Sequence, residues 1–398
     1  MRIAYLTDVE GQWAKLESFA TQNPLVSLDG AGRLQVAAGA RFVFGGDAVD
    51  RGSAARRIVA ALLDVKRRQP DQVVLLAGNR DINKMRLVTE LAGAPPERTP
   101  DALRGGPSAL LLRWIFDNTM GARQAFRHRA EELASAGGAA DDEAVTTSYL
   151  EDLSPTGEHT LYLCACQLGY REGDTLFVHG GVTRESLGHV PNAAGHFDDV
   201  DAWVAGLNQF YAEQCAAFRA REPSGYAALV AYQAPVPGTR LNQASVVYGR
   251  PTDEVGNPIL PAPEVIQRLR RDGVRRVVLG HTPSGDSPAV LRDRAGFELV
   301  LADNSHGRVE LGSQLLLDDE PRIAGVSVLD DGEQVAVLTR LAVEGEDSPL
   351  GLRDATGRLV KGRLLRGDYL VFRGFTGYRI EQSAAAESAL PRPLTPPS

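Results

Sequence analysis

The feature that most constrains the fold of this chain is a series of three short apolar runs near its start, RIAYLTD, RFVFGGD and QVVLLAGN. Each run ends in polar residues, and segments with helical periodicity lie between and after the runs. Short apolar runs bounded by turn residues indicate buried strands, and strands that alternate with helices indicate parallel pairing. The sequence therefore predicts a βαβαβ unit and an α/β fold class.

The segment SAARRIVAALLDVKRRQ is the clearest helix of this unit. Ser53 stands where an N-cap is expected, apolar residues recur every three or four positions, and lysine and arginine crowd the last turn. Such a helix would return the chain for a parallel strand.

Beyond this unit, the sequence predicts two helical insertions and a second half that is mostly sheet. The insertions span about residues 93–159 and 190–242, and caps of this kind usually wall a site. Between them, EHTLYLCACQLGYREGDTLFVHGG is expected to form two strands joined by a polar turn. Strand-like segments return in VRRVVLGHT, FELVLADN, IAGVSVLDD and EQVAVLTRL, of which the last two are joined through an Asp-Gly turn typical of hairpins.

The C-terminal part differs in composition from the rest. Residues 343–383 are predicted to form a short β-rich extension. The C-terminal stretch SAAAESALPRPLTPPS has a composition that cannot bury a core, so the sequence predicts a disordered tail over residues 384–398.

Charge and hydropathy exclude some classes of function. A formal net charge of -8 argues against non-specific binding to nucleic acids, and no apolar run approaches the roughly 20 residues that a membrane span requires. Met1 leads directly into a strand-like segment, so no secretory leader is expected and the predicted location is the cytoplasm. Cys164, Cys166 and Cys215 are interpreted as structural thiols, because the C-x-C spacing fits alternate sides of a strand better than a zinc site.

Side chains that can bind metals follow the predicted strands. In open α/β sheets, the carboxyl ends of the strands converge on the ligand site. Carboxylate, amide and imidazole ligands together suit a pair of divalent ions such as manganese, iron, zinc or magnesium, and a shared carboxylate, assigned to Asp47, would hold them about 3.5–4 Å apart. The candidates are Asp8, Glu10, Asp47, Asp50, Asn79, His179 and His281.

The ordered series TDVEGQ, GDAVDRG, GNRD, VHGG and GHTP resembles the calcineurin-like metallophosphoesterases. Within them it is similar to the branch of serine/threonine phosphoprotein phosphatases and bacterial diadenosine-tetraphosphate hydrolases. The resemblance spans about residues 3 to 305 and implies a four-layered α/β/β/α sandwich, with the helical segments as insertions in a domain over residues 1–342.

The resemblance also implies roles for individual residues. It implies that Asp8, Asp47 and His281 bind a first metal and that Asp47, Asn79 and His179 bind a second. Asp50 would contact these ligands without binding metal itself. Manganese is the expected metal. Arg51 matches the arginine that grips substrate phosphate, and Arg250 in VVYGRP resembles a second phosphate arginine.

Two positions depart from the family's pattern. Glu10 stands where the family usually has histidine, and it is expected to add a carboxylate ligand at the first metal. GNRD replaces GNHE or GNHD, so Arg80 takes the place of a histidine thought to help the leaving oxygen, with Asp81 as the acid beside it. Arginine stays protonated and is a poor proton donor. The predicted catalytic set is Asp47, Asp50, Arg80 and Asp81.

The function implied is a metal-dependent phosphomonoesterase that uses a bridging hydroxide on a phosphorylated substrate, such as a phosphoprotein, with a preference for aryl esters such as phosphotyrosine. One alternative is a hydrolase of nucleotides or dinucleoside polyphosphates, and another is a non-catalytic phosphate-binding scaffold. His306 is an alternative proton donor, whereas four other histidines are interpreted as ordinary polar residues. They are His128, His159, His189 and His196. The sequence leaves the oligomeric state open.

Overall fold

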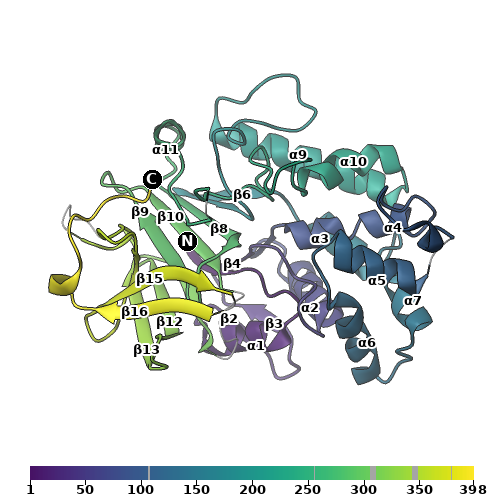
Figure 1. Ribbon diagram of the computed structural model, residues 1–398, viewed down its shortest axis with the longest axis horizontal. Helices are drawn as coiled ribbons and strands as arrows, with labels where there is room; N and C mark the ends of the chain where they lie inside the picture. Colours follow the sequence, from purple (N-terminus) through teal and green to yellow (C-terminus); the bar gives the residue numbers. More distant parts are fainter. Residues whose placement is uncertain (106–107, 255, 305–310, 343–347, 378) are drawn as a thin grey trace.

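Two β-sheets form the centre of the computed structural model, which describes residues 1–398 apart from 106–107, 255, 305–310, 343–347 and 378 (Figure 1). The first sheet has the order β13-β12-β11-β1-β4-β5, and the second has the order β6-β7-β8-β10-β9. The first contains β1 (Arg2–Leu6), β4 (Ala40–Phe44), β5 (Val73–Leu75), β11 (Gln314–Leu317), β12 (Arg322–Val328) and β13 (Gln334–Arg340). The second contains β6 (Gly169–Glu172), β7 (Thr175–Val178), β8 (Arg276–Pro283), β9 (Ala289–Arg292) and β10 (Glu298–Asp303).

The predicted βαβαβ unit is confirmed. β1 pairs in parallel with β4, and β4 pairs in parallel with β5. Helix α1 (Trp13–Gln22) and helix α2 (Ala55–Arg68) make the connections. A small hairpin of β2 (Val26–Leu28) and β3 (Leu34–Val36), which the sequence reading did not predict, lies between α1 and β4.

Alternation along the strands explains why the sheets are layered. Successive side chains of a strand point to opposite faces, so one face of each sheet can pack on the other sheet and the opposite face on helices. Tyr5 of β1 stacks on Phe177 of β7 with ring centroids 5.8 Å apart, which places these side chains between the sheets. On the other face of the first sheet, Phe42 of β4 meets Phe19 of α1 at 5.9 Å.

Helices cover the second sheet as well. Helix α9 (Val200–Arg219) packs against β6, and helix α11 (Pro263–Arg271) buries Val265, Ile266 and Leu269 in the same core before the chain enters β8. The α/β/β/α arrangement that the sequence predicts is therefore confirmed.

The two insertions are helical and lie on the side of the sheets away from the C-terminal strands (Figure 1). The long helical stretch of the first insertion is divided into two helices by a turn in which Gly121 has a φ of 60°. The insertions and the segments beside them contain α3 (Asn79–Asn83), α4 (Arg86–Glu90), the 3₁₀ turn η1 (Asp101–Leu103), α5 (Ala109–Asn118), α6 (Ala125–Ser135), α7 (Asp142–Asp152) and α10 (Pro223–Tyr232).

Two local predictions are wrong. The segment LYLCACQ lies largely in helix α8 (Glu158–Ala165), where His159, Tyr162 and Leu163 are buried at helical spacing, and only the following β6–β7 hairpin is strand. Ser53 does not cap α2, whose N-cap is Ala54 without a side-chain bond. The start of α2 is fixed instead by the bond from the Ala54 amide to the Gly11 carbonyl, at 2.9 Å.

The C-terminal extension forms an antiparallel sheet of β14 (Leu359–Arg363), β15 (Tyr369–Thr376) and β16 (Arg379–Ala385). The prediction of a disordered tail over residues 384–398 is wrong. The tail contains the 3₁₀ turn η3 (Glu387–Ala389), buries Leu390 and Leu394, and bonds through the Pro397 carbonyl to the Leu260 amide at 2.8 Å. The two buried leucines give the tail apolar contacts, which its average composition does not indicate.

A buried lysine fastens this extension to the loop that follows β8. Lys361 of β14 donates from Nζ to the carbonyls of Ser284 and Ser287 at 2.7 and 3.1 Å. Gln382 of β16 donates to Asp286 of the same loop at 2.9 Å. Burial lowers the pKa of Lys361 to about 8, and the nearby Asp286 opposes this shift.

We predict that Lys361 makes stability depend on pH. Between its folded pKa of about 8 and its ordinary value of 10.5, the unfolded chain holds a proton that the folded chain releases, so the free energy of unfolding should rise with pH across this window. Denaturant titrations of the wild type and of Lys361→Met at pH 8 and pH 10 check this. The wild type should gain stability relative to the variant at the higher pH, and identical pH dependence in both would contradict it.

Candidate metal centre

Five loops from the carboxyl ends of strands meet at one edge of the two sheets. The loops after β1 and β4 are joined by a ladder of backbone bonds, in which the amides of Asp8 and Glu10 donate to the carbonyls of Gly46 and Asp47, both at 2.9 Å. The His179 carbonyl after β7 accepts from the Gly280 amide in β8 at 2.9 Å. These backbone hydrogen bonds position the loops independently of their side chains.

The backbone at the candidate ligands is strained. Positive φ values of 51°, 49°, 57° and 57° occur at Asp8, Glu10, Asp47 and His281. Such conformations are unfavourable for residues with a β-carbon and persist only where the surroundings enforce them. Their concentration at one place indicates a functional site.

Close backbone approach also requires glycine here. A β-carbon on Gly78 would lie 2.2 Å from both the amide nitrogen and Oδ1 of Asp47. On Gly46, which has a φ of 100°, it would lie 2.6 Å from the Gly78 amide and 2.8 Å from Nδ1 of His179. The glycines therefore allow three loops to meet at Asp47.

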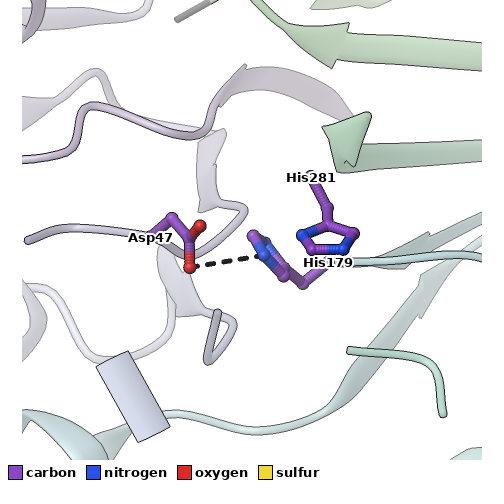
Figure 2. Close-up of side chains that lie close together, drawn as sticks. All are labelled: Asp47, His179 and His281. Atoms are coloured by element: carbon purple, nitrogen blue, oxygen red, sulfur yellow. Dashed lines mark ion pairs between the residues drawn. The ribbon is translucent and has the colours of Figure 1, made fainter. Parts of the chain in front are cut away.

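The structure brings the predicted ligands together in two groups that share Asp47. Asp47, His179 and His281 offer ligand atoms that all lie within 4.8 Å of one another, and Figure 2 shows these side chains pointing toward a common space. Asp8, Glu10 and Asp47 form the second group under the same limit. A shared carboxylate between two clusters is the arrangement that a binuclear centre requires.

His179 is oriented so that it can bind a metal. Its Nδ1 lies 2.8 Å from the Gly45 carbonyl, which can only accept, so Nδ1 carries the proton. The lone pair of Nε2 then faces Oδ1 of Asn79 at 3.2 Å and Oδ1 of Asp47 at 3.4 Å. Three acceptor atoms that face one another repel, and a cation among them would remove the repulsion.

His281 presents a second available lone pair. Its buried Nε2 has no hydrogen-bond partner among the described residues, while its backbone amide donates to Asp8 at 3.2 Å. Burial, and then the charges of Arg250 and His179, lower the pKa of His281 well below its ordinary value of 6.5. The imidazole is therefore neutral, which is the form that binds metals.

Buried carboxylates complete the fit to a cation. Burial is the main cause that raises the pKa of Asp8 well above its ordinary value, and Asp303, Asp47 and Glu10 add to this. Burial also raises the pKa of Glu10 to about 7, although Arg80 and Arg51 oppose the shift. A divalent ion would reverse this preference for the protonated forms, so the residues present fit a metal.

Asp81 acts on the site through the backbone. Its buried carboxylate accepts from the amides of Asp47, Ala48 and Gly78 at 2.9, 2.9 and 3.0 Å. Burial, with the charge of Asp47, raises the pKa of Asp81 to about 7. Asp81 thus fixes the loop that carries Asp47, and its bonds give it a positioning role.

Arg80 lies among three carboxylates. Its Nε is 2.8 Å from Oε1 of Glu10 and 3.5 Å from Oδ2 of Asp47, and its Nη1 is 3.5 Å from Oδ2 of Asp50. Glu10 also contacts Arg51, whose Nη1 lies 3.1 Å from Oε2. The two residues that depart from the family's pattern are therefore in direct contact.

Two buried lysines of the site, Lys15 and Lys84, were not predicted from the sequence. Lys84 places Nζ 2.7 Å from each oxygen of Asp50, so Asp50 lies behind the ligands in an ion pair. Lys15 donates to the Asp8 carbonyl at 2.6 Å. The available signals were the spacing of Lys84 four residues after Arg80 and the position of Lys15 beside Leu16 on the buried face of α1.

A cavity of about 270 Å³ opens onto the ligands. Both predicted caps contribute to its wall, the first through Thr119 and Met120 and the second through Gln233 and Pro235. Its lining also contains Tyr248, Asp303 and four arginines, Arg51, Arg80, Arg86 and Arg250. Nε of Arg250 is buried and lacks a hydrogen-bond partner within the described part of the chain.

Most remaining candidates lie outside the ligand groups. His159 is buried and its Nε2 lies 3.0 Å from the Asp81 carbonyl, and burial lowers the pKa of His159 to about 4. His128 contacts the Asp50 carbonyl at 3.3 Å. His306 lies outside the described residues. The three cysteines are free thiols, and none of them belongs to a metal-ligand group of the described residues.

A family model for calcineurin-like phosphoesterases matches residues 1–285. The chain belongs to this family. Members typically depend on divalent metal ions, and this member is a phosphoric ester hydrolase acting on a phosphorylated substrate. No helix in the described ranges is both long enough and apolar enough to cross a membrane.

Comparison with solved structures finds matches at low identity, whereas no curated protein matches the sequence. A cold-active protein-tyrosine phosphatase from a Shewanella species is 17% identical with a TM-score of 0.46, covering 84% of this chain and 80% of its own. A protein serine/threonine phosphatase from Saccharomyces cerevisiae is 14% identical with a TM-score of 0.39, covering 87% and 82%. A metallophosphoesterase from Sphaerobacter thermophilus is 14% identical with a TM-score of 0.33, covering 86% and 89%.

We predict that this calcineurin-like phosphoesterase is stabilised by Mn²⁺ through Asp47. A ligand at about 100 times its Kd adds about 2.7 kcal/mol to the folded state. Mn²⁺ should therefore raise the Tm of the wild type, and Asp47→Asn should abolish this increase because both ligand groups share its carboxylate. Asp64→Asn, at a partly exposed carboxylate of α2, is the control and should keep the increase. An unchanged Mn²⁺ effect in Asp47→Asn would contradict the assignment.

Proposed function

We propose that this chain is a metal-dependent phosphomonoesterase that prefers aryl phosphoesters, including phosphotyrosine, over phosphoserine and phosphothreonine. The observation that carries the proposal is a single cavity in which acceptor-only ligand atoms face several guanidinium groups. A phosphate group needs both partners, because its oxygens bind metal ions and arginine together.

The proposed metal ligands are Asp8, Asp47, Asn79, His179 and His281. When bound, divalent ions would supply Lewis-acid polarisation of the phosphoryl group and a lowered pKa for water. Mixed oxygen and imidazole donors favour Mn²⁺ in this proposal, with iron, zinc or magnesium as the other candidates.

Arg51 and Arg250 are the proposed phosphate-binding residues. The side chain of Arg51 is 41% exposed, and it lines the cavity beside the ligands. A guanidinium presents two parallel N–H donors, which match two phosphoryl oxygens. The unpartnered Nε of Arg250, buried in the described structure, offers a further donor at the same cavity.

Arg80 determines the proposed preference for leaving groups. Burial opposes its charge, but Glu10, Asp47 and Asp50 outweigh burial and raise the pKa of Arg80 above its ordinary value. Arg80 can therefore donate a hydrogen bond to a departing oxygen but cannot give up a proton. A phenoxide, whose parent pKa is about 10, depends less on protonation than the alkoxide of serine.

A phosphoanhydride is the second candidate substrate class. A phosphate leaving group also departs as a stable anion, and the arginines that line the cavity suit a substrate with more than one phosphate. Hydrolysis of nucleotides or dinucleoside polyphosphates is therefore the alternative activity. A non-catalytic scaffold is disfavoured, because the strained backbone of the ligands and the buried His281 Nε2, which lacks a hydrogen-bond partner among the described residues, serve no purpose in phosphate binding alone.

The leaving-group proposal predicts a difference between matched peptides. We expect kcat/KM on a phosphotyrosine peptide to exceed that on a phosphoserine peptide of the same sequence, because only the alkoxide needs a proton that Arg80 cannot give. Steady-state assays with Mn²⁺ measure this ratio, and Arg80→His should improve the phosphoserine substrate most. Equal or greater efficiency of the wild type on phosphoserine would refute the preference.

The phosphate-binding role predicts the effect of Arg51→Ala. A charged hydrogen-bonded contact contributes about 1.5–3 kcal/mol, so kcat/KM should fall about ten- to hundredfold. Arg67→Ala, at an exposed residue in the last turn of α2, is the matched control and should leave kcat/KM unchanged. A normal kcat/KM in Arg51→Ala would assign Arg51 a structural role.

A further inference from the structure

Both oxygens of Glu10 form ion pairs with arginine, although Oε2 has no hydrogen-bond partner among the described residues. Oε1 lies 2.8 Å from Nε of Arg80, and Oε2 lies 3.1 Å from Nη1 of Arg51. The Glu10 side chain is 3% exposed, so water does not compete for these contacts. The Glu10 carboxylate would therefore have to break one of these two ion pairs before it could bind a metal.

The other acidic ligand candidates are not engaged in this manner. The Asp8 carboxylate accepts from the Thr7 hydroxyl at 2.6 Å and from the backbone amide of His281, and both of these donors are neutral groups. Asp47 accepts from the Arg80 amide at 2.8 Å and has the Arg80 side chain only at 3.5 Å. Within the described part of the chain, the closest guanidinium contacts of these carboxylates therefore belong to Glu10.

Glu10 also determines where the Arg80 side chain points. The carboxylate of Asp50 is already paired with Lys84 at 2.7 Å, and Asp47 is shared by the two ligand groups. Without Glu10, the nearest remaining acidic partner of the Arg80 Nε would be Asp47, at 3.5 Å. Glu10 thus holds the guanidinium on the cavity wall and away from a ligand that a metal needs.

We propose that Glu10 is a positioning residue that anchors Arg80 and Arg51 side by side in the cavity, and that it does not bind metal. The inference rests on the proposed function and revises the expectation that Glu10 is a ligand. Two guanidiniums on one carboxylate carry a net charge of +1, so the trio forms a cationic clamp for phosphoryl oxygens. The two departures from the family's pattern then act as a pair, because the Glu10 carboxylate orients the Arg80 guanidinium and the guanidinium balances the buried charge of Glu10.

Metal binding separates an anchor from a ligand. The isosteric variant Glu10→Gln should keep the Mn²⁺ stoichiometry of the wild type, with a Kd changed by less than about threefold, when measured by calorimetry and metal analysis. Asp8→Asn is the ligand control and should weaken Mn²⁺ binding at least about tenfold, in line with loss of a metal ligand. Loss of an Mn²⁺ equivalent in Glu10→Gln would overturn the proposal.

Binding of inorganic phosphate tests the clamp itself. In the Mn²⁺-loaded protein, Glu10→Gln should weaken phosphate binding about tenfold or more, the range expected when a charged hydrogen bond is lost. In a double-mutant cycle with Arg80→Gln, the second substitution should add less than about twofold. Fully additive effects would show that the two residues act independently and would overturn the proposal. If Glu10→Gln does not fold, Glu10→Asp takes its place with the same expected outcomes.

A failure of the proposed function gives a different result. If the wild type neither binds Mn²⁺ nor hydrolyses phosphoesters, the proposed function fails. In that case, the double-mutant cycle of Glu10→Gln and Arg80→Gln is repeated on the chelator-treated protein, with the denaturation midpoint of each variant as the measured quantity. There, non-additive losses support the Glu10–Arg80 anchor and additive losses contradict it.

Discussion

The site depends on burying several acceptor groups at one place, where the Arg80 guanidinium lies 3.5 Å from Asp47 on one side. The carboxylates of Asp8 and Asp47 and the free lone pairs of His179 and His281 converge within a few ångströms, and burial makes their mutual repulsion strong. Arg80 relieves part of it from the side, but its closest partner is Glu10. A divalent ion between these acceptors would remove the remaining repulsion, so the residues present fit a metal.

The fold makes this concentration of charge possible. Alternating strands bury one face against the other sheet and one face against helices, which leaves the carboxyl ends as the place where polar loops meet. The loops are then fixed by backbone bonds and by Asp81, which binds three amides around Asp47. That network enforces the positive φ of Asp47, so hydrogen bonds between the loops hold the strained conformation.

Much of this architecture could be predicted from the sequence, because local patterns encode it. The βαβαβ unit, the ligand series and the walls formed by the caps follow from strand ends and spacing. The features that were not predicted depend on tertiary contacts. Helix α8 and the start of α2 are set by packing and by the Gly11 carbonyl, and the tail is ordered by Leu390 and Leu394. The Glu10–Arg80 pair joins residues far apart in the chain, which no local pattern reveals.

The most direct test of the account is a crystal structure of the protein soaked with Mn²⁺, with the metal located by its anomalous scattering. The account predicts two Mn²⁺ ions that share Asp47, with Asp8, Asn79, His179 and His281 as the other ligands. It also predicts that Glu10 stays paired with Arg80 and outside the coordination of either ion. An absence of Mn²⁺ between these ligands at saturating metal would contradict the central claim.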